Sequence, residues 1–474
     1  MSTTKPRWTI ALVTVAAMSL IAACDGGGNS TSSETSTSSG AKVNPSDCGL
    51  DELAAAKKPV EVSFWHVQAE ADATNLEALA TKFNESQNDV HVTLVQQPDY
   101  PSEMQKWQAG MTTGDLPDVA QMEETTVQRL VDSDSTVPVE ACVKADKFDL
   151  SDFSERSLAF YTVDDVLQAM AWSVSNVALF YNRADFTKAG LDPDTPPATL
   201  AELETVSKQL VDSGVVPHGL ALRIAPYFHE FWSAKAGQTL VNHDNGRDGR
   251  ATKSTIDTKV GRELWTWWKR MVDSGLAINI GSEAGTIDHF LAVGNHQAAM
   301  TVEANANLAR IDEALSAGGW VDVDLAVAPL PGLDAGGGVP IGDGSLWISK
   351  KSPKAKRAAA WQWIKFLVSE EAQVAWHTEK GSVPTRVSVS EDPKVTELWA
   401  QRPAFKIGWD QLQQGPLDAA TSGSLIGPYQ EVRNAVTNGI TSMLTDGTSP
   451  ATALQRAQSE ADDAITDYNS RIGG

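Results

Sequence analysis

The sequence predicts an α/β protein built as two lobes, and three observations support this prediction. Segments with the pattern of buried strands alternate with segments of helical periodicity, and this alternation then repeats further along the chain. With 474 residues, 42% of them hydrophobic, the chain is long enough for a large core but too long for a single one. Because strand–helix alternation produces parallel sheets with right-handed crossovers, we expect two lobes with parallel or mixed sheets flanked by helices.

The first residues have the features of a secretory signal peptide. Lys5 and Arg7 precede a short apolar run that is too short to span a bilayer. The run ends in Leu20-Ile21-Ala22-Ala23-Cys24, the pattern of a bacterial lipobox. We therefore expect residues 1–23 to be removed and the thiol of Cys24 to carry a lipid. The alternative is an ordinary signal peptide that happens to contain a cysteine.

A polar segment follows Cys24 and is rich in glycine, serine and threonine. Such a segment cannot bury enough apolar surface to fold, so we expect a flexible tether over residues 24–57. A lipid on Cys24 would anchor the protein outside the cytoplasm, and this anchor would be its only contact with the membrane.

The chain has three cysteines, an odd number for an exported protein. If Cys24 is acylated, Cys48 and Cys142 remain as a pair in an oxidising compartment. A disulfide between them would stabilise the fold by about 4–5 kcal/mol in the chain-entropy model. The alternative is two separate buried thiols. Their spacing does not predict a metal site.

Charge and motifs exclude several classes of function. The formal net charge of −23 argues against binding to nucleic acid and against broad adhesion to anionic lipid. The sequence contains no HExxH, GxSxG or GxxxxGK[ST] motif, so neither catalysis nor a cofactor is predicted. A secreted glycoside hydrolase remains a rival class, because it would also place carboxylates and tryptophans in a cleft. A surface lectin without a transporter is a second rival.

In the first α/β unit, strands and helices follow each other in strict order. Buried strands are expected at 60–66 and 119–122, and residues 90–95 alternate between apolar and polar as in a half-buried strand. Apolar residues at helical spacing predict helices at 76–83 and 102–111.

A second unit repeats this order, and a helical region ends the chain. Strands are expected at 167–174, 177–181, 218–222, 298–302 and 323–328, with helices at 200–213 and 255–274. The C-terminal helices are expected at 353–368, 371–380, 395–413, 430–444 and 451–472. In open α/β sheets, ligands bind at the carboxyl ends of the strands, so a cleft there is the expected site.

Four segments in this order resemble a known family: VEVSFWHV (60–67), GLDPDTPPATL (190–200), IGDGSLW (341–347) and AWHTEKGSVP (375–384). They are similar to the extracellular solute-binding proteins of carbohydrate ABC importers, and most similar to the glycerol-3-phosphate-binding branch. The resemblance implies a two-lobed, periplasmic-binding-protein-like clamp that delivers its ligand to membrane permeases. We expect the N-terminal lobe over 58–172 and 301–344, and the C-terminal lobe over 173–300 and 345–474.

The resemblance also implies ligand-binding residues. Tyr100, Glu124, Ser175 and Arg433 match the tyrosine, acidic, serine and arginine contacts of the glycerol-3-phosphate-binding branch. A carboxylate accepts hydrogen bonds from hydroxyls and arginine donates them in a planar fork, as a sugar or polyol requires. If Arg433 serves only the ligand, Arg433→Ala should weaken binding with little change in thermal stability.

Other positions depart from that branch. Arg223 and Tyr227 lie where it has paired tryptophans, Asn305 lies near a pocket serine, Asp343 replaces a glycine and Ser382 replaces a tyrosine. An added carboxylate repels phosphate unless Arg223 offsets it. The ligand is therefore expected to be a neutral sugar, an oligosaccharide or a polyol, with glycerol 3-phosphate or a glycerophosphodiester as the alternative.

Aromatic side chains bury the apolar faces of sugars, and Tyr227, Trp232 and Trp65 are candidates. Trp65 lies in an apolar strand, where a core position is the more common role. The remaining expectations concern partners: a small carbohydrate or polyol, ABC permease subunits, no nucleic acid, and a monomeric state.

Overall fold

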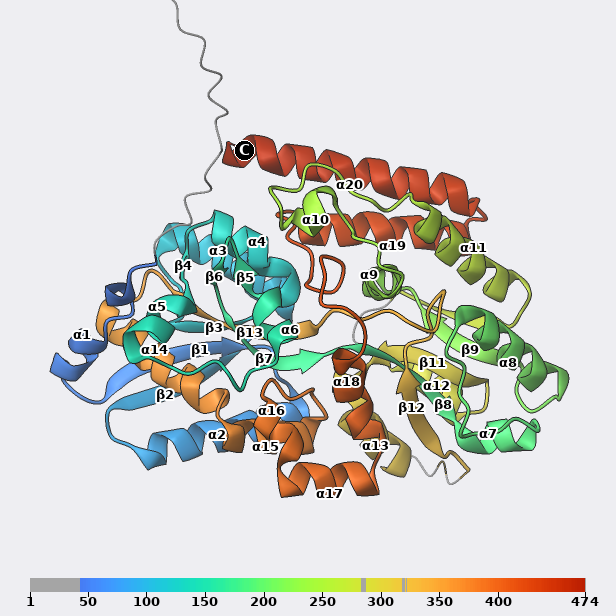
Figure 1. The fold of residues 1–474 in the computed structure, drawn as a ribbon, viewed down its shortest axis with the longest axis horizontal. Helices are drawn as coiled ribbons and strands as arrows, with labels where there is room; N and C mark the ends of the chain where they lie inside the picture. Colours follow the sequence, from blue (N-terminus) through green and yellow to red (C-terminus); the bar gives the residue numbers. More distant parts are fainter. Residues whose placement is uncertain (1–42, 283–286, 318–319, 321, 474) are drawn as a thin grey trace, which may run out of the picture. The chain divides into compact units, whose positions relative to one another are not determined.

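The computed structural model describes residues 43–282, 287–317, 320 and 322–473 (Figure 1). The expected signal peptide, Cys24 and the tether up to residue 42 lie outside the described residues. No helix in the described part of the chain has the length and apolar character that a membrane crossing needs.

The first sheet is mixed and has the strand order β2-β1-β3-β13-β4, with β7 also paired to β13. Its strands are β1 (Val60–His66), β2 (Val90–Gln96), β3 (Val119–Glu123), β4 (Thr136–Val137), β7 (Met170–Ser175) and β13 (Gly342–Ser349). β1 runs parallel to β2 and β3, whereas β13 is antiparallel to each of its neighbours. The strand–helix–strand order expected for residues 60–122 is therefore confirmed.

The second sheet has the order β10-β9-β11-β8-β12. Its strands are β8 (Val177–Asn182), β9 (His218–Arg223), β10 (Ala277–Gly281), β11 (Ala298–Ala304) and β12 (Leu325–Pro329). β9 is parallel to β10 and β11, and β8 is antiparallel to β11 and β12. A two-stranded ladder joins β5 (Thr162–Val163) to β6 (Val166–Leu167). Two mixed sheets with flanking helices make the two-lobed fold that the sequence predicts.

The helices flank the sheets, and α19 and α20 pack along each other at the end of the chain (Figure 1). In the N-terminal half they are α1 (Leu50–Ala55), α2 (Glu70–Ser86), α3 (Tyr100–Thr113), α4 (Val127–Asp132), α5 (Val139–Asp146), α6 (Glu155–Phe160), α7 (Arg183–Lys188), α8 (Leu200–Asp212), α9 (Pro226–Lys235) and α10 (Asn242–Gly246). In the C-terminal half they are α11 (Lys259–Asp273), α12 (Asp288–Gly294), α13 (Leu308–Ala317), α14 (Lys354–Leu367), α15 (Glu370–Lys380), α16 (Val387–Glu391), α17 (Pro393–Gln401), α18 (Ala404–Gln413), α19 (Tyr429–Thr445) and α20 (Pro450–Ile472).

The single helix expected over residues 395–413 is two helices in the structure. The segment 395–413 is divided between α17 and α18, and Pro403 lies at the break. Proline has no backbone N–H to donate and its ring clashes with the preceding turn, so a continuous helix is disfavoured there.

The sheets divide the chain differently from the expected lobe boundaries. The segment 301–344, expected in the N-terminal lobe, holds β12, which pairs with β8 of the second sheet. The chain returns to the first sheet only with β13, and α14 then packs against β1 of that sheet although it was expected in the C-terminal lobe. We correct the boundaries accordingly: the sequence pattern identifies strands but does not say which sheet a late strand joins.

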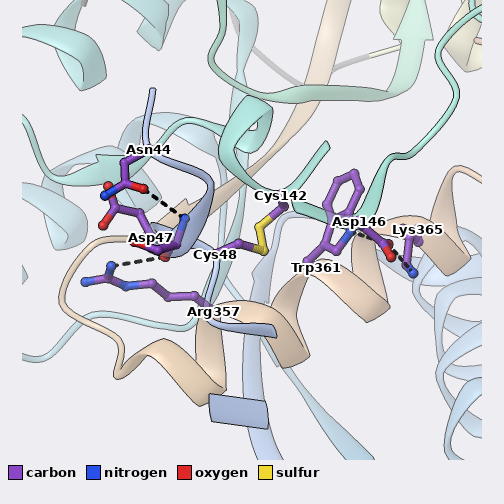
Figure 2. The surroundings of a disulfide bond; sticks show 9 residues. Asn44, Asp47, Cys48, Cys142, Asp146, Arg357, Trp361 and Lys365 are labelled. Carbon is purple, nitrogen blue, oxygen red and sulfur yellow. Dashed lines mark hydrogen bonds and ion pairs between the residues drawn. A yellow bond between two sulfur atoms is a disulfide. The ribbon is translucent and has the colours of Figure 1, made fainter. Parts of the chain in front are cut away.

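Cys48 and Cys142 form a disulfide, as the cysteine count predicts (Figure 2). Both are fully buried, and Cys142 lies on α5. Nearby, Asp146 accepts hydrogen bonds from the indole of Trp361 at 2.9 Å and from the ammonium of Lys365 at 2.6 Å. The bond therefore fixes the N-terminal segment to α5, beside α14.

The expected tether is too long at its C-terminal end. Residues 43–57 are not an extended spacer, because they contain the 3-10 turn Pro45–Asp47 and helix α1. Leu53 is buried, and α1 packs along α14. The disulfide at Cys48 and the packing of α1 against α14 account for the folded structure of residues 43–57. A composition rich in glycine and serine predicts neither of these contacts.

The tryptophans mostly fill the core. Trp265 and Trp268 of α11 and Trp361 and Trp363 of α14 are buried, as their helical spacing predicts. Trp65 is also buried in β1, with the ammonium of Lys106 4.1 Å from its ring centroid.

Candidate functional site

A cavity of about 370 Å³ lies where strands of both sheets end. Its lining includes residues at the ends of β7, β9 and β11, the first residues of β13, and the residues that follow β3. The full lining comprises Val67, Gln68, Ala69, Glu70, Asp72, Tyr100, Glu123, Glu124, Ser175, Asn176, Val177, Arg223, Tyr227, Phe231, Glu303, Ala304, Ala306, Asn307, Arg310, Gly342, Asp343, Lys380 and Arg433. The size suits a small solute, and this edge of an α/β sheet is where such ligands bind.

Arg433 of α19 is the centre of a buried cluster of charges. Its Nε and Nη2 donate to the two carboxylate oxygens of Glu230 at 2.7 and 2.8 Å. The same Nη2 donates to Glu124 at 2.8 Å, and Nη1 donates to Glu123 at 3.0 Å. Only 7% of Arg433 is exposed. One guanidinium thus links three carboxylates that come from β3, the turn after it, and α9.

The three carboxylates together would carry more negative charge than Arg433 can balance, and the pKa of Glu124 is shifted upwards. Burial raises its pKa to about 8, although the charge of Arg433 opposes this. A protonated Glu124 leaves two carboxylates against one guanidinium. Removing Arg433 would leave the buried Glu124 and Glu230 and the half-buried Glu123 without their shared partner, so we expect Arg433→Ala to lower stability as well as ligand binding.

Asp343 organises the neighbouring part of the wall. Its carboxylate accepts from the Tyr100 hydroxyl at 2.7 Å and from the Ser173 hydroxyl at 3.1 Å. Its backbone N–H donates to Glu124 at 3.0 Å. The ammonium of Lys380 lies 3.8 Å from Asp343 and 3.5 Å from Asp72, so it is shared between two carboxylates.

The backbone conformation at positions 343 and 344 restricts which side chains these positions can carry. Asp343 has a φ of 77°, a left-handed conformation that glycine adopts without strain and aspartate tolerates better than most residues. The next residue, Gly344, has no room for a side chain, since a Cβ there would lie 2.8 Å from the Tyr100 hydroxyl. The segment IGDGSLW is thus shaped to bring Tyr100 against Asp343.

On the opposite wall, Arg223 is paired with a single carboxylate. Its Nε donates to Glu303 at 2.7 Å, and its Nη2 donates to the Tyr227 hydroxyl, which in turn donates to Glu303. His289 Nε2 lies 3.0 Å from Glu303. Burial opposes ionisation of Glu303, but His289 and Arg223 outweigh it and hold its pKa at about 2.

Each cationic side chain in the described lining already has an acidic partner. Arg433 and Arg223 are paired as above, and Lys380 lies between Asp72 and Asp343. Arg310 lies 3.5 Å from Glu70. A phosphate entering the cavity would therefore meet cations whose charge is already offset by carboxylates, and it would gain little net attraction to repay its desolvation. A hydroxyl, in contrast, can donate to these carboxylates without disturbing a pair.

The structure brings together seven of the residues expected from the sequence. Tyr100, Glu124, Ser175, Arg433, Arg223, Tyr227 and Asp343 all line the cavity.

Three expected residues lie outside this lining. Trp232 is buried among Phe228, Trp267 and Trp268, and its indole donates to the carbonyl of Pro331 at 3.0 Å. Asn305 is buried beside the cavity; its side chain accepts from the Asn176 backbone and donates to the Gly381 carbonyl.

The third, Ser382, is also buried and uses its carbonyl to accept from the imidazole of His377 at 2.6 Å. Trp232, Asn305 and Ser382 thus hold the framework of the site, and the aromatic rings that reach the cavity are those of Tyr100, Tyr227 and Phe231.

Sequence reasoning missed Glu230, Glu303 and Lys380. Glu230 and Glu303 are the single carboxylates of two largely apolar segments, PYFHEFWSAK and AAMTVEA, and both are buried. An isolated carboxylate in an apolar segment is the signal that identifies them, since a buried charge requires a partner. Lys380 ends α15 before Gly381 and has the appearance of an ordinary C-terminal cation.

Comparison with known proteins agrees with this fold. Residues 78–406 match the family of bacterial extracellular solute-binding proteins. The sn-glycerol-3-phosphate-binding periplasmic protein UgpB of Yersinia pseudotuberculosis is 25% identical over 411 residues, which cover 85% of this chain and 91% of that protein. UgpB of Salmonella typhimurium is 25% identical over 406 residues, covering 84% and 90%.

Solved structures have the same fold. The GacH receptor of Streptomyces glaucescens superposes with a TM-score of 0.71 at 24% identity, covering 86% of this chain and 99% of that one. The sugar-binding protein MalE of Xanthomonas citri gives 0.72 at 21% identity, covering 87% and 99%. The chain therefore belongs to the bacterial extracellular solute-binding proteins, as its motifs predict: it is a non-catalytic, extracytoplasmic solute-binding protein of an ABC importer.

Proposed function

We propose that this protein captures an uncharged sugar, oligosaccharide or polyol in the cavity and delivers it to the permease subunits of its importer. One observation carries the proposal: each cation in the described lining is already balanced by carboxylate. A neutral ligand needs no uncompensated cation, whereas an anionic ligand would lose its hydration without meeting a net positive charge.

The lining supplies the chemistry that a polyhydroxyl ligand needs. Carboxylates of Glu123 and Asp343 accept hydrogen bonds from hydroxyls, and Arg223 donates to ring or hydroxyl oxygens. Tyr227 and Phe231 offer aromatic surface to the C–H faces of a sugar ring. Acceptors, donors and apolar surface thus converge on one volume.

A glycerophosphate is the second candidate. It is favoured by the similarity to the UgpB proteins, and by the structure of UgpB from Mycobacterium tuberculosis in complex with glycerophosphocholine, which has the same fold with a TM-score of 0.71 at 18% identity. It is disfavoured by charge, because Glu123, Glu230 and Asp343 lie around the arginine and lysine that a phosphate would need.

We also propose that a lipid on Cys24 anchors the protein at the outer face of the cell membrane. The support is the sequence LIAAC, together with the Cys48–Cys142 disulfide, which leaves Cys24 as the remaining cysteine. Mass spectrometry of the protein extracted from membranes should find a diacylglycerol on Cys24. Release of a Cys24→Ser variant into the medium is the matching result, and an unmodified Cys24 would contradict the anchor.

A thermal-shift screen of the chain from Lys42 onward tests the ligand class. It compares mono- and oligosaccharides and polyols with glycerol 3-phosphate and glycerophosphodiesters. A ligand at about 100 times its Kd adds about 2.7 kcal/mol to the free energy of unfolding, which raises the melting temperature measurably. We expect a shift with one neutral series. A shift with phosphate compounds alone would overturn the neutral assignment in favour of the second candidate.

A further inference from the structure

Glu303 differs from the other buried carboxylates of the described lining because its arginine has no second acidic partner; the other single pair, Arg310 with Glu70, is exposed. Among the described residues, Arg223 pairs with no other acidic side chain. Arg433, in contrast, has three carboxylates, and Lys380 has two. Loss of one carboxylate would leave Arg433 and Lys380 still matched, but loss of Glu303 would leave Arg223 as an uncompensated cation.

The surroundings of Glu303 hold it in place and ionised. It is 2% exposed, and it is contacted by Arg223, by the Tyr227 hydroxyl and by His289. Its Oε1 also accepts from the backbone N–H of Ala304 at 2.7 Å. Four contacts on one buried carboxylate fix its position, so the ion pair with Arg223 is preformed rather than assembled around a ligand.

Arg223 still faces the cavity while it is paired. Its Nε and one Nη are engaged by Glu303 and Tyr227, and its second Nη has no hydrogen-bond partner among the described residues. The wall therefore offers N–H donors without a net charge. Such a surface binds an uncharged oxygen and gives an anion no net attraction to offset its desolvation.

We propose that Glu303 sets the charge selectivity of this cavity: by neutralising Arg223, it makes that wall bind uncharged oxygens and reject phosphate and carboxylate groups. The proposal rests on the proposed neutral ligand and adds the residue that enforces it. Glu303 acts through Arg223, so it is a positioning and selectivity residue.

The test is a gain of anion binding in Glu303→Gln. The substitution keeps the shape of the side chain and removes its charge, which frees the guanidinium charge of Arg223. The probes are inorganic phosphate and glycerol 3-phosphate, titrated into the chain from Lys42 onward by isothermal calorimetry. We expect both to bind Glu303→Gln at least about tenfold more tightly than the wild type, a difference equivalent to about 1.4 kcal/mol.

Two control variants separate charge from general disturbance. Glu303→Asp keeps the charge and should not gain phosphate affinity. The double variant Arg223→Gln/Glu303→Gln lacks the freed cation and should lose the gain again. A merely structural role for Glu303 would predict weaker binding of every probe and no reversal in the double variant. A folded Glu303→Gln protein with no gain for either anion would overturn the proposal.

A second measurement does not require that Glu303→Gln folds. In wild-type protein with ¹⁵N-labelled arginine, the Nε–H resonance of Arg223 is assigned by its loss in Arg223→Gln. We expect it to stay fixed during a phosphate titration; movement that follows saturable phosphate binding would overturn the proposal. The sugar screen is independent of both tests, so a neutral ligand can be established even if Glu303 proves not to select for it.

Discussion

Arg433 and Arg223 line the same cavity, but they are balanced in different ways. Arg433 gathers Glu123, Glu124 and Glu230, so its cluster has more acid than base. Arg223 faces only Glu303, and that pair is neutral.

This difference in charge balance indicates different roles for Arg433 and Arg223, which the sequence alone does not distinguish. The Arg433 cluster joins β3, α9 and α19, so it stabilises the structure around the cavity as well as lining it. The Arg223 pair lies within one lobe, between β9 and β11, and mainly presents donors to the ligand. An arginine at a cavity is therefore not by itself evidence for an anionic ligand; the carboxylates around it decide.

The largest expected effect is on Arg433. Arg433→Met should lower the free energy of unfolding by about 3–5 kcal/mol, because the buried Glu124 and Glu230 and the half-buried Glu123 lose their common partner. Denaturant unfolding followed by circular dichroism measures this. Lys208→Met, which removes a cation from an exposed ion pair with Asp212, is the control and should change stability by less than about 1 kcal/mol. Equal small losses in both variants would show that the cluster is not structural.

Arg223→Met should have a smaller effect on stability. It leaves one carboxylate, Glu303, which still has His289 3.0 Å away as a partner that becomes cationic when protonated. A loss of about 1–3 kcal/mol is expected in the same denaturation experiment. A loss as large as that of Arg433→Met would mean that the two clusters do not differ in the way described.

Glu124 should make the stability of the protein depend on pH. Its folded-state pKa of about 8 lies above the ordinary value of 4.5, so the folded protein retains a proton that the unfolded chain releases. Stability should therefore fall as pH rises towards 8, and this fall should be reduced in Glu124→Gln, which cannot titrate. Thermal melts of both proteins across this range measure the difference, and parallel curves would contradict the assignment.

Three buried histidines also make stability depend on pH, and they set the lower limit of the pH range in which Glu124 can be tested. Burial lowers the pKa of His66, His229 and His377 to about 4 from the ordinary 6.5. The folded protein keeps them neutral while the unfolded chain takes up protons, so they destabilise the fold as pH falls from about 6.5 to 4. The window from 6.5 to 8 therefore excludes these histidines, and the comparison with Glu124→Gln separates Glu124 from Glu103, whose pKa burial also raises.

The smallest expected effect is at Asp343. Asp343→Gly removes the acceptor for Tyr100 and Ser173 but relieves a left-handed backbone, so the two changes should offset to within about 1 kcal/mol. Asp343→Ala loses the same hydrogen bonds and keeps the backbone strain. It should be less stable than Asp343→Gly by about 1 kcal/mol in thermal melts. Equal stability of the two variants would show that the backbone conformation has no cost.

Much of the fold follows from local patterns. The parallel strands β1, β2 and β3 are recognisable because apolar residues and helical segments alternate between residues 60 and 122. β10 and β13 were not expected as strands, because AINIG and GDGSLWIS carry glycines and polar residues that weaken the pattern. Their pairing depends on distant segments, which local periodicity does not report.

The site was predictable only in part. Tyr100, Glu124 and Arg433 are found by similarity to a family motif, and the structure places them around one volume. The charge balance depends on Glu230 and Glu303, which are far from their partners in sequence and carry no motif. The charge of ligand that the cavity accepts depends on all these groups together, so it can be inferred only when the distances between them are known.

A cavity lined by three arginines, each already paired with carboxylate, is expected to bind a neutral solute, and competition calorimetry tests this most directly. The sugar that gives the largest thermal shift is titrated into wild-type protein, alone and with glycerol 3-phosphate in excess. We predict saturable binding of the sugar with an unchanged Kd in the presence of glycerol 3-phosphate, and no heat from glycerol 3-phosphate alone. Saturable binding of glycerol 3-phosphate, with the sugar displaced or silent, would contradict the account.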